Sequence, residues 1–193
     1  MTKTSRNIAL FVIAAALVAA GCGSSSKPSA STVPATTDPP AGAPGHYAKP
    51  VSDKPSTSAK MICESDVEGE VFDIVGVKPS KPLAPTWNDH VYSCKYVYPG
   101  GTMTLSVKEL ADKQQTDAYF ASLATQLHKK KAIQGLGQGA FTTQNDSAVV
   151  RKDYKVLTVD VSGLPANFGT PPDLRGNVAL NVAAEIMSCW TGQ

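Results

Sequence analysis

One cysteine, Cys22, stands between an apolar run and a Ser-rich segment whose composition is unsuited to folding. Before it, residues 8–20 form an unbroken apolar run, IALFVIAAALVAA, which follows the cations Lys3 and Arg6. The run is shorter than the roughly 20 residues that a membrane-spanning helix needs. Its length and its basic flank are typical of the apolar core of a secretory signal. We therefore expect the folded part of the chain to lie well after Cys22.

The residues around Cys22 indicate how the mature chain begins. Ala19-Ala20-Gly21-Cys22 resembles the lipobox of bacterial lipoproteins, whose cysteine receives a diacylglyceryl group after which the preceding peptide bond is cut. The resemblance implies that residues 1–21 are a signal peptide and that Cys22 anchors the protein to the extracytoplasmic face of the bacterial cell membrane. Stable anchoring of this kind needs more than one acyl chain. The alternative is an ordinary secretory signal in which Cys22 has no role.

Residues 22–60 have the composition of a tether. Ser, Thr, Pro, Ala and Lys dominate the segment, and large apolar side chains are nearly absent. Such a segment cannot bury enough apolar surface to offset its loss of chain entropy. We interpret it as a disordered and partly polyproline-II tether. It would hold a domain formed by residues 61–193 away from the membrane.

The formal charge argues against a nucleic-acid partner. The chain has 18 basic and 16 acidic residues, and removal of residues 1–21 takes away Lys3 and Arg6 but no acid. The mature chain then has no net charge. Nucleic-acid-binding domains usually carry a basic patch or stripe, so we expect that this protein does not bind nucleic acid.

The periodicity of residues 61–193 predicts an α+β domain. Apolar residues recur with a helical period in three segments and alternate with polar residues in five shorter ones. We expect helices at 62–75, 113–130 and 172–190, and strands at 92–96, 103–107, 139–143, 148–152 and 155–161. Residues 78–88, with three prolines, are expected to form a loop. Tight turns between strands imply an antiparallel sheet of about five strands against about three helices, in the order α-β-β-α-β-β-β-α.

Three cysteines follow the proposed lipid site. An exported protein meets an oxidising compartment, where disulfides persist. Cys63 falls on the apolar face of the first helix, and Cys94 falls on the inward face of the first hairpin. We therefore expect a Cys63–Cys94 disulfide first, and a Cys63–Cys189 disulfide remains open as the alternative.

A family resemblance follows from these features. A helical cysteine, then Tyr92-Ser93-Cys94-Lys95-Tyr96 in a strand, then residues 136–141 (LGQGAF) before a hairpin, resembles the small two-cysteine envelope lipoproteins of actinobacteria. The small residues of the last helix are similar as well. Most of these lipoproteins are uncharacterised. The resemblance implies a sensor-like or accessory domain without a known enzyme activity, although Cys189 departs from the two-cysteine pattern.

Motifs for catalysis or metal binding are weak. Asp89-His90 is the best candidate for a catalytic base with its acid, but the sequence has no Gly-x-Ser-x-Gly elbow. It also lacks C-x-x-C and H-x-x-x-H pairs, and the acids of residues 64–70 spread around a helix. The glycines of residues 135–139 follow a helix and precede a strand, the reverse of a phosphate loop. We therefore expect no catalytic residue, no metal and no cofactor.

These features favour a non-enzymatic binding or accessory module that acts on an envelope protein or a cell-wall component. Its possible interaction surface contains Trp87 and Tyr98, the two aromatic residues near the first hairpin that are most suited to exposure. The alternative, which we favour for the aromatic cluster as a whole, is that these side chains belong to the core. One alternative is a carrier of a small apolar or lipid ligand held between sheet and helices. A second alternative is an envelope hydrolase, which would need His90 beside an acid and a hydroxyl.

Overall fold

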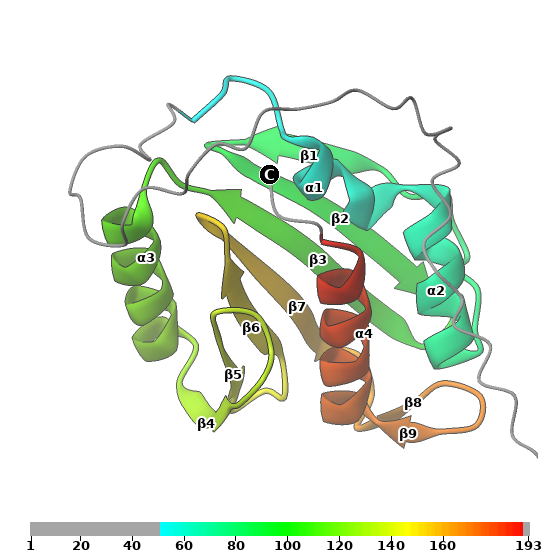
Figure 1. The fold of residues 1–193 in the computed structure, drawn as a ribbon. Helices are drawn as coiled ribbons and strands as arrows, with labels where there is room; N and C mark the ends of the chain where they lie inside the picture. Colours follow the sequence, from blue (N-terminus) through cyan, green and yellow to red (C-terminus); the bar gives the residue numbers. More distant parts are fainter. Residues whose placement is uncertain (1–50, 191–193) are drawn as a thin grey trace, which may run out of the picture. The chain divides into compact units, whose positions relative to one another are not determined.

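The computed structural model describes residues 51–190, which lie within one compact unit of the chain (Figure 1). The predicted signal peptide, the lipidation site Cys22 and the tether up to residue 50 lie outside the described residues. Among the helices of residues 51–190, none combines the length and the hydropathy that crossing a membrane requires.

A seven-stranded antiparallel sheet forms the centre of the domain, with the strand order β1-β2-β3-β7-β6-β5-β4. Every neighbouring pair is antiparallel. The strands are β1 Pro85–Asn88, β2 Val91–Tyr98, β3 Gly101–Glu109, β4 Lys129–Ile133, β5 Gly139–Thr143, β6 Ala148–Lys152 and β7 Lys155–Gly163. A separate two-stranded ribbon is formed by β8 Asn167–Phe168 and β9 Asp173–Leu174. The α+β class agrees with the prediction, and the sheet has two more strands than expected.

Helices lie on both faces of the sheet. The helices are α1 Thr57–Lys60, the 3-10 turn η1 Met61–Cys63, α2 Ser65–Val75, α3 Lys113–Gln126 and α4 Arg175–Cys189. Side chains of α1, η1, α2 and α4 share one core cluster with the inward residues of β2, β3 and β7. Side chains of α3 form a second cluster with Phe141, Val149 and Val156, which project from the opposite face. Figure 1 shows α2 and α4 lying against the sheet and α3 set apart from them.

The first helix is broken and begins earlier than the sequence predicts. Ser56 caps α1 by accepting a hydrogen bond from Ala59 N, and Glu64 is extended between η1 and α2. Ala59 is fully buried in the main core. The folded domain therefore includes at least residues 56–60, whose composition alone predicts part of the tether. Ser, Thr and Lys dominate this stretch, so composition alone hides the one buried alanine.

The second predicted helix ends four residues early. Leu127 closes α3, His128 takes a left-handed conformation with φ of 50°, and the three lysines after it form β4 rather than the end of the helix. The helix-end interpretation of the lysines is wrong because pairing of β4 with β5 supplies the hydrogen bonds that a longer helix would have made. The predicted loop at 78–88 likewise contains β1, whose pairing with β2 is a tertiary interaction that local composition does not reveal.

The last helix packs closely on the sheet through small side chains. Ala179, Val182 and Ala183 are fully buried, as the sequence pattern predicts. The helix begins at Arg175 instead of residue 172, because Asp173 and Leu174 pair with β8. The helices α4 and α2 together cover one face of the sheet. Among the described helices, α3 alone packs on the opposite face.

Candidate binding face of the sheet

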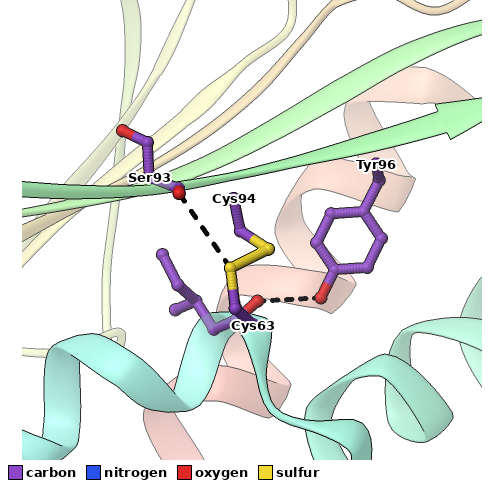
Figure 2. Close-up of a disulfide and its surroundings, with 5 residues drawn as sticks. Cys63, Ser93, Cys94 and Tyr96 are labelled. Carbon is purple, nitrogen blue, oxygen red and sulfur yellow. Dashed lines mark hydrogen bonds between the residues drawn. A yellow bond between two sulfur atoms is a disulfide. The ribbon is translucent and has the colours of Figure 1, made fainter. Parts of the chain in front are cut away.

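The disulfide fixes the first helical segment on the closed face. Cys63 and Cys94 are bonded across 31 positions of sequence, which is the first of the two pairings expected. Cys63 is therefore not paired with Cys189, which ends α4. Figure 2 shows Cys63 Sγ beside the carbonyl oxygen of Ser93, at 3.9 Å. Because a disulfide sulfur carries no hydrogen, we treat this approach as a van der Waals contact.

Tyr96 adds a second connection between the same two elements. Its hydroxyl donates a hydrogen bond to the carbonyl oxygen of Ile62 at 2.8 Å (Figure 2). Both residues are fully buried. Burial raises the pKa of Tyr96 far above its ordinary value, and Tyr98 and Glu68 add to this. The side chain therefore stays protonated and keeps its donor at any physiological pH.

The two residues of the predicted aromatic interaction surface differ in exposure. Tyr98 is 4% exposed and packs against Phe168, so the expectation that it lies on the surface is wrong. The reason is strand parity, since Tyr98 projects from the same face as Cys94 and Tyr96. Trp87 is partly exposed on β1, and its Nε1 donates to the carbonyl oxygen of Asp53 at 2.9 Å. Trp87 thus holds the described N-terminal segment against the sheet edge.

The structure does not assemble the Asp89-His90 pair into an acid–base unit. The Asp89 carboxylate is exposed and bonds to Lys108 Nζ at 2.9 Å, which lowers its pKa. The His90 ring packs edge-on against Trp87, with ring centroids 5.8 Å apart.

Among residues 51–190, one group of three side chains of metal-ligating type lies close together. It consists of Glu70, Glu185 and Cys189, whose candidate ligand atoms lie within 4.8 Å of one another where α2 meets α4. Burial and then the Glu185 charge raise the pKa of Glu70.

The opposite face of the sheet carries a feature that the sequence reading missed. Thr86 of β1 lies opposite Ser93 of β2, Ser93 opposite Ser106 of β3, and Ser106 opposite Thr158 of β7. Paired residues in a sheet project from the same face. The four hydroxyls therefore form one line across four strands, which we call the hydroxyl row. Thr86 is exposed and the other three are partly exposed.

A second polar row runs beside the first. Lys95 lies opposite Thr104, and Thr104 lies opposite Asp160. These positions are two residues along each strand from the hydroxyl row, so they share its face. The Asp160 carboxylate is held by hydrogen bonds from Ser147 Oγ and Ser162 N. We call the hydroxyl row and this second row together the polar face.

The polar face ends where α3 begins to cover the sheet. Beyond Thr158 the same line of paired residues continues as Val149 and Phe141. Both are fully buried against the side chains of α3. The sequence thus places apolar residues where a helix covers the face and hydroxyls where no described helix does. This arrangement is suited to polar ligands, because each hydroxyl both donates and accepts a hydrogen bond.

One sequence signal could have identified the polar face. In β3, Thr102, Thr104 and Ser106 alternate with the buried Met103, Leu105 and Val107. Such alternation is typical of a sheet with one solvated face. Comparison of the chain with protein-family models, with curated proteins and with solved structures gives no match.

Proposed function

We propose that the protein is a lipid-anchored lipoprotein of the extracytoplasmic membrane face, and that it acts as a non-enzymatic binding or accessory module of the bacterial cell envelope. The observation that carries the binding part is the polar face. Two rows of polar side chains stand in register on the part of the sheet that the described helices leave open. A polar partner, whether an envelope protein or a wall component, would meet a preformed set of donors and acceptors there.

The chemistry of the face supports binding more than turnover. Its members are hydroxyls, one ammonium and one carboxylate whose Oδ1 atom already accepts two hydrogen bonds. Groups of this kind, fixed by the strand register, can orient a ligand at low entropic cost. The hydrolase alternative would need His90 beside an acid, and the Asp89 carboxylate is bonded to Lys108 instead.

The anchoring part of the proposal rests on the sequence around Cys22 and has its own test. A Cys22→Ala variant should lose the lipid and be recovered outside the membrane fraction, whereas the parent chain sediments with membranes. Metabolic labelling with a fatty acid distinguishes the two chains directly. Membrane association of the variant equal to that of the parent would contradict the anchoring proposal.

The binding part is tested by blocking the polar face. In a Ser106→Arg/Thr158→Arg variant, two long cations project where short hydroxyls lie in the parent. An Ala184→Arg variant is the control, because Ala184 is exposed on α4 and belongs to the opposite layer. We expect the face variant, but not the control, to lose co-sedimentation with insoluble wall polymer or capture of a solubilised envelope protein. Equal retention in both variants would contradict the assignment of the face.

A further inference from the structure

The two edges of the sheet differ in how they are protected. The β1 edge begins at Pro85, which has no backbone N–H, and the described N-terminal segment is held against this strand by the Trp87–Asp53 hydrogen bond. The other edge is β4, which pairs with β5 on one side only. Its first four residues are all exposed, and no other described strand lies beyond it. Such an edge presents unpaired backbone groups to solvent.

Three consecutive lysines give the β4 edge a strong positive charge. Lys130 forms an ion pair with Asp146 at 3.1 Å. Lys129 lies over the Phe141 ring, with Nζ 5.8 Å from the centroid. Within residues 51–190, neither Lys129 nor Lys131 has an acidic partner. Two ammonium groups are therefore available to a ligand along an open strand.

The two available lysines project from opposite faces of the sheet. Lys129 is paired with Thr143, while Lys131 is paired with Thr142, because a register shift lies between them. Adjacent residues of β5 point to opposite faces, so these two lysines do as well. A flat anionic surface that lies against either face of the sheet would meet only one of them. An added strand can meet both, since two neighbouring acidic residues also project to opposite faces.

We propose that β4 is a docking site for an extended acidic peptide segment, which adds to the sheet as an eighth strand. The regular pairing of Lys131, Ala132 and Ile133 with β5 leaves their outer backbone groups aligned for such an addition. Backbone hydrogen bonds supply the binding, and Lys129 and Lys131 select an acidic segment over neutral or basic ones. The lysines otherwise repel a second copy of the same edge, which keeps the edge from pairing with itself. This site is separate from the polar face and does not depend on it.

The test measures binding of a labelled peptide to the full-length chain in a neutral detergent by fluorescence anisotropy. The probe is Thr-Val-Glu-Glu-Val-Thr, blocked at both ends. One control probe replaces both acids with Lys, and another carries N-methyl groups on all of its backbone amides, so that those facing β4 are blocked in any register. We expect saturable binding of the acidic probe, weakening at high salt. Failure of the acidic probe to bind, or binding of the N-methylated probe with equal affinity, would overturn the proposal.

Matched protein variants locate the site. Lys129→Glu/Lys131→Glu should weaken binding by roughly tenfold or more, because two attractions become repulsions. Lys129→Arg/Lys131→Arg should retain it. Lys54→Glu/Lys60→Glu makes the same charge change at exposed residues outside β4 and should have little effect. An equal loss in the two Glu variants would overturn the assignment to β4, and so would binding to vesicles of anionic lipid that competes with the peptide.

Discussion

Removal of the Cys63–Cys94 disulfide should produce the largest single loss of stability among the changes considered. The bond spans 31 positions of sequence. In the chain-entropy model a loop of this length restricts the unfolded chain by roughly 3 to 4 kcal/mol. A Cys63→Ala/Cys94→Ala variant should lose about this free energy of unfolding. The loss acts mainly on the unfolded state, so the structure of the folded variant should change little.

Urea unfolding without reductant measures this loss. The chain has two tryptophans, Trp87 on β1 and Trp190 directly after α4. Their fluorescence reports on the unfolding of the sheet edge and of the last helix. Removal of the crosslink should also make the free energy of unfolding depend more steeply on urea concentration, since the freed unfolded chain exposes more surface. Val71→Ala is the control, because it removes buried apolar volume and leaves the crosslink intact. It should cost about 2 kcal/mol with an unchanged denaturant dependence.

The entropic reasoning is refuted by two results together. One is a loss below about 1 kcal/mol in the disulfide variant, which is far under the value for this loop length. The other is a denaturant dependence equal to that of the parent. A large loss with an unchanged denaturant dependence would instead locate the effect in the packing of the buried Cys94 side chain.

Three further predictions concern single residues. Tyr96→Phe should cost about 1 to 3 kcal/mol in urea unfolding, because it leaves the buried carbonyl oxygen of Ile62 without its donor; no measurable loss would contradict the role of this bond. Gly137→Ala should cost about 1 to 3 kcal/mol, since φ is +56° and a Cβ would lie 2.7 Å from Arg151 O; an unchanged midpoint would refute this. The hydrogen bond from Lys130, with help from Arg175, lowers the pKa of Asp146 in the folded protein. The ionised Asp146 side chain therefore contributes its full stabilisation of the fold above about pH 4, the pKa of Asp in the unfolded chain. This stabilisation declines as the pH falls through the lower pKa of the folded protein. Asp146→Asn should reduce this acid sensitivity, and an identical pH profile in the variant would contradict the assignment.

Local patterns predicted the elements whose residues alternate or recur regularly. The hairpin of β2 and β3, the strands β5 to β7 and the small-residue face of α4 all follow from periodicity. In these elements one face is buried, so the spacing of the apolar residues along the sequence indicates whether the segment is a helix or a strand. The α+β class follows from their order.

The remaining elements depend on tertiary pairing. β1 and β4 are the two edge strands, and each pairs on one side only. Edge strands are polar and short, so their residues resemble those of loops or helix ends. The lysines of β4 show the ambiguity, because the same residues also suit the last turn of a helix.

The candidate site was missed for a related reason. Ser93, Ser106 and Thr158 lie far apart in sequence and become one row only through the register of three strand pairs. The sequence suggests a surface position for Tyr98, because aromatic side chains near a turn are suited to interfaces. The parity of β2 places it inside. Register is a property of pairing, and a single strand does not determine it.

Site-specific photocrosslinking in intact cells tests the central claim most directly. A photoreactive residue replaces Lys95, which is exposed on the polar face, and in a control chain it replaces Ser188, which is exposed on α4. The account predicts a discrete crosslinked envelope component from position 95 and none from position 188. The same product from both positions, or none from position 95 in cells that retain the anchored protein, would contradict the claim that this face binds a partner.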